Sequence, residues 1–337
     1  MLLTNDHPGL LVHWHPIART GSPGTVVSAT LFGRRYVVAH LDDGPLVSLD
    51  ACPHRGARLS LGTVVAAPRT GASCLQCPYH GWSFDAAGTC VTIPALGSSP
   101  IPARAALDAV PARTALGLVW IRGDHGQEGF DPILVPEWEA PGIEAAWLPE
   151  VVVGCSAGQF IDNFCDFAHF PFVHAGTFGG DEEAEIGDLE VETDGEDGLR
   201  LTYRHEASNR EDPLVDSGDH PLIQPREMYA SVRSPFSARL RILLPLTGVE
   251  NTVLVVASPT DADRTTLFTV LLRNDLHGDA ERAAHSIDYE MSVLAEDLRI
   301  IEDLADPGLE LDLPSQVHTR ADRLTVEYRN LLRRTIR

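Results

Sequence analysis

The sequence contains no lysine, so arginine supplies every basic side chain other than histidine. Acidic residues outnumber arginines by 48 to 26, which gives a formal net charge of −22 at pH 7. Nucleic acids and anionic membrane surfaces attract proteins through lysine and arginine, so this balance argues against both as partners. A redox protein and a small-molecule substrate are the partners that the composition leaves open.

Long hydrophobic runs are also missing. No stretch of about 18 or more apolar residues occurs, so we expect no membrane-spanning helix. The first ten residues, MLLTNDHPGL, lack the charged segment and apolar core of a secretory signal, and we expect a cytoplasmic protein. In that compartment, six cysteines in a chain of 337 residues are better explained by metal ligands and buried thiols than by disulfides.

The chain is longer than most single domains, which favours two. From residue 25 to 122, short apolar runs alternate with turn residues, a pattern typical of an all-β domain. A helical stretch at 156–169, several strand patterns and a long helical pattern at 278–305 follow. We predict an α+β chain with an all-β domain over 10–125. The second domain, over 126–337, packs a long C-terminal helix against a curved antiparallel sheet.

Two short segments combine cysteine with histidine. Residues 52–56 read Cys-Pro-His-Arg-Gly, and residues 77–82 read Cys-Pro-Tyr-His-Gly-Trp. Each segment supplies one thiolate and one imidazole. A Rieske [2Fe-2S] cluster needs two of each, because cysteines bind one iron and histidines the other. The predicted cluster ligands are Cys52, His54, Cys77 and His80.

A zinc site is the alternative for these residues. Cys74 and Cys77 form a C-x-x-C pair that could join Cys52 and His54. The C-x-H spacing is tighter than zinc sites usually have, and this assignment leaves His80 without a role. We therefore favour the cluster.

A second group of potential ligands lies near the middle of the chain, where Asp166, His169 and His174 occur within nine residues. We expect Pro171 to end or kink a helix between the two histidines, so that both imidazoles can converge. Two histidines and one carboxylate form the facial triad of non-haem iron(II) oxygenases. His169 and His174 are therefore predicted iron ligands.

The carboxylate of this triad must come from elsewhere, and the long C-terminal helical pattern offers one. Asp297 lies within the apolar stripe of that helix, and a buried carboxylate needs a cation such as iron. Glu296 falls on a face that solvent can reach, which makes it a weaker candidate. The expected lining of a substrate pocket above the iron is Glu290, Val293, Leu294, Phe160 and Phe167. Glu290 could pair with a basic or N–H-bearing substrate, or be an ordinary surface acid.

Residues 52–82 resemble the Rieske domain of aromatic-ring-hydroxylating oxygenases, and the D-x-x-H-x4-H pattern of residues 166–174 matches their catalytic domain. The alpha-only N- and O-demethylases are the most similar group, through the helix around Ala295-Glu296-Asp297 and the tail from Ala321 to Arg329. The resemblance implies a helix-grip (START-like) second domain, with one [2Fe-2S] cluster and one Fe(II) per chain. It also implies that NAD(P)H supplies electrons through a ferredoxin or flavin reductase.

The same resemblance implies a homotrimer in which Asp166 lies between His80 of one subunit and His169 of the next. Asp166 would accept hydrogen bonds from the outer N–H groups of both imidazoles, which fixes the rings and couples the two centres. Asn163 could orient this contact, although a solvated helix residue is an equal alternative. Trp82 is expected beside the cluster ligands.

The activity implied by the resemblance is that of an oxygenase component, a monooxygenase or dioxygenase. It would use O2 to hydroxylate or oxidatively demethylate a small aromatic or heterocyclic substrate. Oxidative cyclisation needs the same kind of site and stays open. Two interpretations without catalysis are an electron carrier and a non-catalytic partner subunit, and the predicted iron ligands argue against both.

Overall fold

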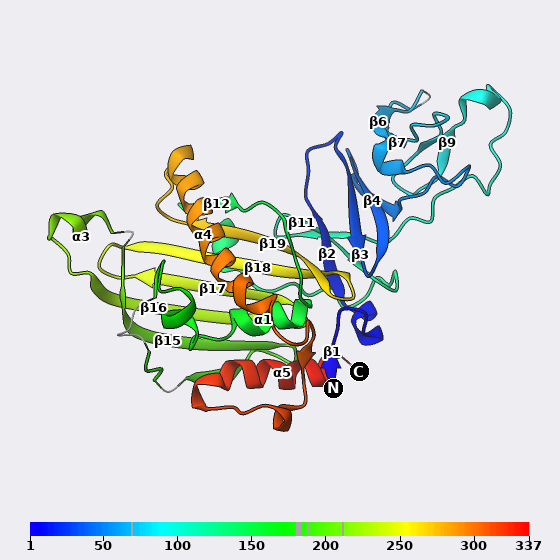
Figure 1. Cartoon of the computed structure of the whole chain (residues 1–337). Helices are drawn as coiled ribbons and strands as arrows, with labels where there is room; N and C mark the ends of the chain where they lie inside the picture. Colours follow the sequence, from blue (N-terminus) through cyan, green and yellow to red (C-terminus); the bar gives the residue numbers. More distant parts are fainter. Residues whose placement is uncertain (69, 180–183, 188, 211, 337) are drawn as a thin grey trace. The chain divides into compact units, whose positions relative to one another are not determined.

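Contacts within the chain divide it into two units, Leu11–Phe130 and Asp131–Arg337, and the first ten residues belong to the second unit. The structure is a computed structural model that describes all residues except 69, 180–183, 188, 211 and 337. Figure 1 shows the short strands of the first unit and the large sheet of the second.

The unit formed by Leu11–Phe130 consists of short antiparallel strands in three sheets, ordered β10-β11-β2, β3-β4-β5 and β6-β7-β8-β9. The strands are β2 (Trp14–Arg19), β3 (Val26–Leu31), β4 (Arg34–Leu41), β5 (Gly44–Leu49), β6 (Thr63–Ala66), β7 (Ser73–Gln76), β8 (Ser83–Phe84), β9 (Cys90–Thr92), β10 (Arg113–Ala115) and β11 (Leu118–Arg122). The prediction of an all-β N-terminal domain is confirmed.

Apolar packing fixes the ends of the strands that lead into the two cysteine–histidine segments. One core of this unit contains Val37, Leu75 and Phe84 from the strands, and it also buries Cys52 and Cys77. The thiols of the two segments are thus held by the same core that holds the sheets.

The second unit is built around one antiparallel sheet in the order β12-β19-β18-β17-β16-β15-β14, with β13 also paired to β19. Its strands are β12 (Glu144–Trp147), β13 (Val151–Val153), β14 (Glu190–Thr193), β15 (Gly198–Ser208), β16 (Ile223–Arg233), β17 (Ser237–Leu244), β18 (Val249–Asp261) and β19 (Arg264–Arg273). Buried side chains alternate with more exposed ones along β15 and β16, so one face of the sheet is buried.

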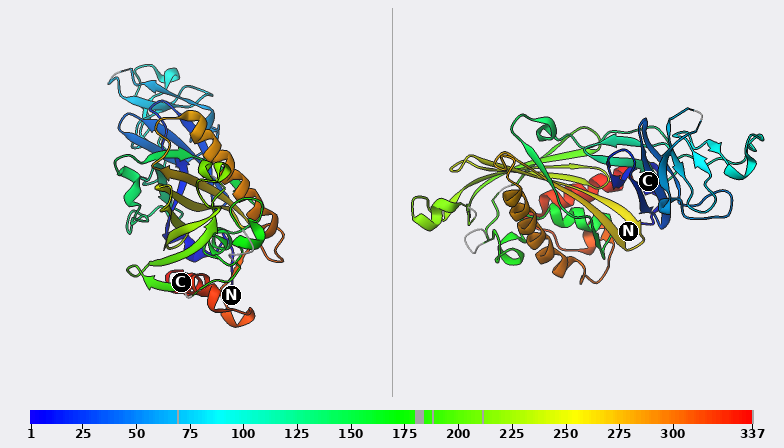
Figure 2. Two further views of the ribbon diagram at one scale, coloured as in Figure 1. Left: turned by 90° about the vertical axis from the view of Figure 1, so that its left-hand side faces the viewer. Right: turned by 90° about the horizontal axis from the view of Figure 1, so that it is seen from above.

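Helices cover that sheet on one side, as Figure 2 shows. They are α1 (Ala157–Phe164), α2 (Phe170–Val173), α4 (Ala280–Ile301) and α5 (Arg323–Thr335), while α3 (Pro213–Ser217) lies in the connection from β15 to β16. Helix α1 contacts β17, β18, α4 and α5, and so lies at the centre of this layer. Short 3-10 helices lie at Pro8–Val12, Leu59–Leu61, Pro94–Leu96, Pro136–Glu139, Leu313–Ser315 and Arg320–Asp322. The predicted α+β domain with a long C-terminal helix on an antiparallel sheet is confirmed.

The helical stretch predicted at 156–169 is interrupted in the structure. Helix α1 ends at Phe164, and α2 begins only at Phe170. Between them, Asp166 Oδ1 accepts a hydrogen bond of 2.9 Å from the backbone N–H of Ala168, which closes a turn. Pro171 lies in the first turn of α2, where its missing N–H is not needed. The prediction that Pro171 ends or kinks a helix between the two histidines is therefore wrong, because Pro171 lies at the start of the short helix that separates them.

The N-terminal residues are anchored to the second unit. Strand β1 (Leu2–Leu3) pairs with β20 (Leu309–Glu310). The Asn5 amide donates to the carbonyls of Asp261 and Arg264 at 3.0 and 2.9 Å, and its oxygen accepts from the N–H of Ala157 at 2.9 Å. Asn5 thus joins the β18–β19 turn to the start of α1.

A buried ion pair joins α1 to α5. Arg329 Nε and Nη2 lie 2.9 and 2.6 Å from the two carboxylate oxygens of Asp162, and both residues are less than a tenth exposed. Arg329 Nη1 also donates to Gln316 Oε1 at 2.6 Å. This paired geometry holds in place the helix that precedes the two histidines.

We expect Arg329→Ala to lower the free energy of unfolding by about 3 to 5 kcal/mol, because it leaves the buried Asp162 carboxylate without its cation. Chemical denaturation followed by circular dichroism measures the change. Arg333→Ala, at an exposed position of the same helix, is the control and should change stability by less than about 0.5 kcal/mol. Equal effects of the two substitutions would contradict the role given to this pair.

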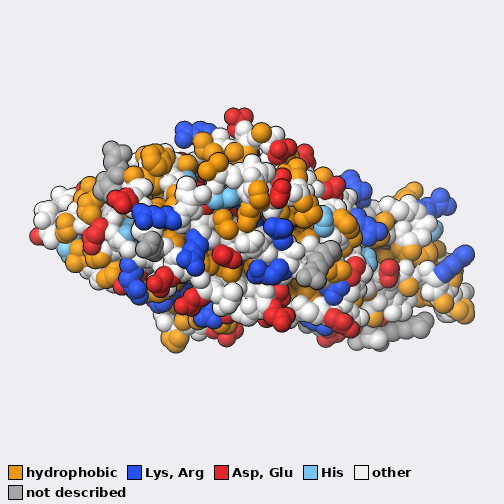
Figure 3. All heavy atoms as spheres, turned by 90° about the horizontal axis from the view of Figure 1, so that it is seen from below, with side chains coloured by type: hydrophobic (Ala, Val, Ile, Leu, Met, Phe, Trp, Pro, Cys, Tyr) orange, Lys and Arg blue, Asp and Glu red, His pale blue; other side chains and the backbone are white. Residues whose placement is uncertain are grey.

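Both signs of charge occur together on the face shown in Figure 3, where arginine and acidic side chains are interspersed. Although the whole chain has a net charge of −22, this face does not carry charge of a single sign. Among the described residues, no helix is long and apolar enough to cross a membrane.

Candidate metal centres

The two cysteine–histidine loops share one backbone pattern. In the first, the N–H of Gly56 donates to the carbonyl of Cys52 at 2.8 Å, and in the second, the N–H of Gly81 donates to Cys77 at 3.1 Å. Both glycines have φ of +70°, in the left-handed region that glycine adopts without strain. The repeated turn buries each cysteine, at 3% and 2% exposure, and leaves the histidine of each loop exposed.

The predicted cluster ligands lie close together at the ends of these loops. The ring centroids of His54 and His80 are 4.5 Å apart, and His54 stacks on Trp82 at 4.6 Å with an interplanar angle of 6°. Burial, reinforced by the neighbouring Cys77 thiol, raises the pKa of Cys52 to about 11, although backbone N–H groups of the loop oppose this. A thiolate here requires strong positive charge beside it, which iron ions provide. The donor set therefore fits a [2Fe-2S] cluster.

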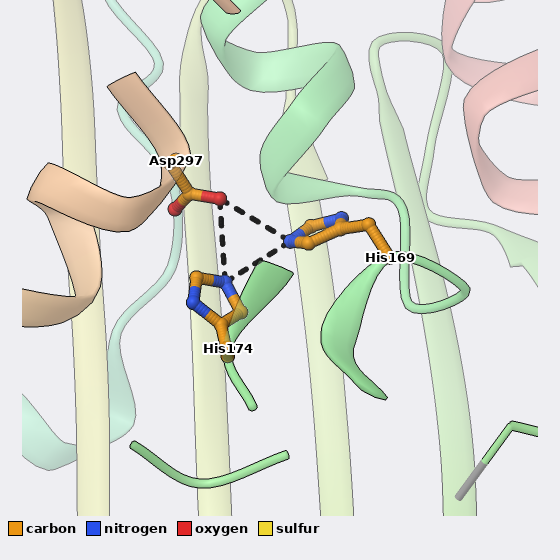
Figure 4. Close-up of side chains that lie close together, drawn as sticks. All are labelled: His169, His174 and Asp297. Carbon is orange, nitrogen blue, oxygen red and sulfur yellow. Dashed lines mark hydrogen bonds and ion pairs between the residues drawn. The ribbon is translucent and has the colours of Figure 1, made fainter. Parts of the chain in front are cut away.

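The three predicted ligands of the mononuclear site converge, as Figure 4 shows. Nε2 of His169 lies 3.1 Å from Nε2 of His174, and Asp297 Oδ1 lies 3.3 Å from each of these nitrogens. His169 immediately precedes α2 and His174 immediately follows it, so four helical residues set the spacing of the imidazoles. Asp297 comes from α4 on the opposite side of the site.

These separations fit a single metal ion. Ligand atoms at about 2.1 Å from one ion lie about 3.0 to 3.4 Å apart when the angles range from octahedral to tetrahedral. The chemistry agrees, because His174 Nδ1 lies 2.9 Å from Glu296 Oε2 and donates its proton to that carboxylate. A metal ion bound to Nε2 of His174 leaves the ring proton on Nδ1, where Glu296 accepts it, and also makes the close approach of Nε2 to the Asp297 oxygen favourable.

Neighbouring charges shift the pKa values of His169 and Asp297 in opposite directions. Burial disfavours protonation of His169, but the carboxylates of Asp166 and Asp297 outweigh it and raise the pKa of His169 to about 9. Burial alone would raise the pKa of the Asp297 carboxyl, yet the two imidazoles hold it well below its usual range. A proton and a metal ion thus compete for the same imidazole.

We therefore expect the affinity for Fe(II) to rise about tenfold per pH unit up to about pH 9 and then level off, because binding displaces one proton from His169. Anaerobic calorimetric titration of the protein, depleted of mononuclear iron, between pH 6.5 and 9.5 in buffers of different ionisation enthalpy gives both affinity and proton release. An affinity that does not change over this range would contradict the competition.

Other polar residues lie around the three ligands. Asp166 Oδ2 is 3.6 Å from Nδ1 of His169, beyond hydrogen-bond distance, and that buried nitrogen has no hydrogen-bond partner. The Asp166 side chain is about a third exposed, at 31%. Asn163 Nδ2 donates to Asp297 Oδ1 at 3.1 Å. The structure thus places Asn163 against the predicted ligand Asp297, although the sequence suggested a role in orienting Asp166.

Glu296 is a site residue that the sequence analysis missed. It was placed on a solvent-accessible helix face, and its side chain is 23% exposed. Its Oε2 atom nevertheless accepts hydrogen bonds from His174 Nδ1 and, at 2.8 Å, from Thr177 Oγ1. The positions of residues around helix α4 could not reveal these contacts, because the segment after α2, with His174 and Thr177, covers a face of α4 that the sequence alone leaves open to solvent.

A cavity of about 140 Å³ adjoins the three ligands. Phe160, Glu290, Val293 and Leu294 line it, in the positions that the sequence analysis gives them. Phe167 does not, because it is 1% exposed and stacks on Tyr203 with ring centroids 6.0 Å apart. The sheet supplies the opposite wall, where no residue was predicted: Met228, Leu240, Ile242, Asn251, Val253 and Val255.

Comparison with family models covers both units. The model of the Rieske [2Fe-2S] domain matches residues 13–111, which include both cysteine–histidine loops. The model of the vanillate O-demethylase oxygenase C-terminal domain matches residues 153–337, which include the triad. The first match favours a cluster over the zinc site that Cys74 would complete.

Individual relatives extend this similarity over nearly the whole chain. Methylxanthine N1-demethylase NdmA of Pseudomonas putida is 30% identical over 98% of this chain and 91% of its own length. Methylxanthine N3-demethylase NdmB of the same species is 28% identical over 97% and 90%. The solved structure of NdmA from P. putida CBB5 with caffeine has a TM-score of 0.78 and 27% identity, and the match covers 98% of this chain and 92% of that one.

Proposed function

The chain belongs to the Rieske oxygenase alpha subunits, and we propose that it oxidatively demethylates or hydroxylates a small aromatic or heterocyclic substrate. As a member of this family it is an oxidoreductase that uses O2 and carries a [2Fe-2S] cluster and a mononuclear iron site. It is the oxygenase component of a multicomponent system and takes electrons from a reductase or ferredoxin. The convergence of two imidazoles and one carboxylate beside a largely apolar cavity carries the proposal.

The residue roles follow from the two sites. Cys52, His54, Cys77 and His80 would hold the cluster, and His169, His174 and Asp297 would hold the iron. When bound, the cluster supplies single electrons and the iron activates dioxygen. The protein's own part is to keep the Nε2 atoms of the two imidazoles 3.1 Å apart and to leave one side of the triad open to the cavity.

The cavity supports a flat, mostly apolar substrate. About half of its lining residues are apolar, and polar residues, among them Asn251, Glu290 and Arg226, form the rest. Two relatives are named methylxanthine demethylases, and methylxanthines are small, flat heterocycles with N-methyl groups. We propose a ring compound with an N- or O-methyl group, oriented by Val293 and Leu294. Oxidative cyclisation is the second candidate, because it needs the same triad.

We also propose a homotrimer in which the Rieske loops of one subunit meet Asp166 of the next. Tyr79 in the second loop is 63% exposed, and Phe172 in α2 is 72% exposed. Exposed aromatic rings beside two predicted redox sites support an interface there. We propose the cytoplasm as the location, where a ferredoxin or flavin reductase has NAD(P)H available.

Low-temperature EPR of anaerobically purified protein tests the proposal. After reduction with dithionite and addition of nitric oxide, we expect the signal of a reduced Rieske cluster together with that of a high-spin iron-nitrosyl. A surrogate reductase, NADH and caffeine or methoxybenzoates should then give formaldehyde. A cluster signal without the nitrosyl, even after addition of Fe(II), would make the chain an electron carrier instead.

A further inference from the structure

Two consecutive residues of α4 contact the two nitrogens of one imidazole. Asp297 Oδ1 lies 3.3 Å from His174 Nε2, and Glu296 Oε2 lies 2.9 Å from His174 Nδ1. The ring is 1% exposed, so solvent does not compete for either nitrogen. We infer that Glu296 is a positioning residue that fixes the tautomer and the plane of His174 for metal binding. This inference rests on the proposed function, because it takes His174 as an iron ligand.

The hydrogen bond favours one tautomer of His174. When a metal ion occupies Nε2 of His174, the ring proton lies on Nδ1, and the Glu296 carboxylate at 2.9 Å accepts it. Nε2 then carries the lone pair and faces the metal position. Carboxylates that accept from the outer nitrogen of a metal-bound histidine orient the ring and increase its basicity.

The Glu296 carboxylate has a second hydrogen-bond donor, and a glycine leaves room beside it. Thr177 Oγ1 donates to the same oxygen, Oε2, at 2.8 Å. At Gly176 an added Cβ would lie 2.9 Å from the other oxygen, Oε1, so glycine leaves the space that this carboxylate occupies. The carboxylate thus has both a buried imidazole and a hydroxyl as donors, and Gly176 leaves space for it, which distinguishes it from an ordinary surface acid.

The test compares Fe(II) binding by the full chain and by two Glu296 variants, each with an intact Rieske cluster. Glu296→Ala should weaken Fe(II) binding about 10- to 100-fold, the range for losing an outer partner of a metal ligand. Glu296→Gln keeps an acceptor but loses the charge, so its loss should be smaller. The iron-nitrosyl EPR line shape should change in Glu296→Ala, because the ring of His174 is no longer held in one plane.

Glu302→Ala is the matched control. Glu302 caps the same helix and accepts a hydrogen bond of 2.7 Å from the N–H of Gly154, so it is an acid of α4 with a structural contact away from the triad. It should leave Fe(II) affinity and the nitrosyl line shape unchanged. Thermal unfolding and the cluster spectrum verify that every variant is folded.

Wild-type affinity and line shape in Glu296→Ala would overturn the inference while leaving the proposed function intact. An equal loss of affinity in Glu302→Ala would also overturn it, because the effect would then be a general one of α4. A wild-type chain that binds no Fe(II) would instead refute the proposed function itself. The three failures are thus distinguishable.

Discussion

Asp297→Ala is expected to abolish turnover and to leave the optical and EPR spectra of the Rieske cluster unchanged. The substitution removes one of three ligands and also the carboxylate that lies 3.3 Å from both imidazoles. Fe(II) affinity should fall by more than about 100-fold. Losing a residue that only contacts a metal ligand already lowers the affinity by up to about 100-fold, and Asp297 would bind the metal directly. Iron analysis of the purified variant, with the cluster iron subtracted, and formaldehyde release during turnover measure the two effects.

Asp303→Ala is a suitable control for this substitution, because it removes an exposed carboxylate close to the end of α4. It should retain mononuclear iron and turnover. If Asp297→Ala keeps its mononuclear iron, the assignment of Asp297 as a ligand is wrong. If it loses iron only together with the cluster, the chain has misfolded, and the cluster spectrum reports this.

Asp166→Ala should lose most of its turnover, by about 100-fold or more, while both metal centres stay loaded. The carboxylate lies at the surface, 3.6 Å from a buried Nδ1 of His169 that has no hydrogen-bond partner. In the proposed trimer, a shorter distance between Asp166 and Nδ1 of His169 would let Asp166 connect His169 to the neighbouring subunit's Rieske loop. Reoxidation of the prereduced cluster, after mixing with O2 and substrate, should slow by the same factor as turnover.

A second variant separates this role from a local structural one. Asp166→Asn keeps an oxygen that can accept from the N–H of Ala168, so the turn after α1 is preserved. It still loses the negative charge, and we expect slow cluster reoxidation in this variant too. Normal turnover in both variants would refute the bridging role of Asp166.

The sequence predicted those parts of the site in which spacing along the chain decides the geometry. The two cysteine–histidine loops are short turns, and glycine and proline fix them locally, so the ligands could be named without the fold. Asp297 could be found because a polar residue in an apolar stripe is unusual. These predictions needed only local rules.

The parts that the sequence did not predict depend on which elements meet. In the sequence, Glu296 falls on a helix face that solvent can reach. Only the packing of the segment after α2 against α4 brings it to His174. Phe167 was expected to line the pocket, but it follows the break after Phe164, and its ring stacks on Tyr203 instead. Strand β16 has no clear strand pattern in the sequence, because Pro225 and charged residues interrupt it, yet it pairs with β15 over its whole length.

The pairing of β1 with β20 also has a consequence for synthesis of the chain. The unit formed by Leu11–Phe130 is complete once residue 130 has left the ribosome, and it can fold while the rest is still being made. Strand β1 precedes this unit but must wait for Leu309 and Glu310 before it has a partner. The redox-active unit is therefore an insertion in the catalytic unit, and residues 1–10, although translated before that unit, are among the last to reach their final contacts.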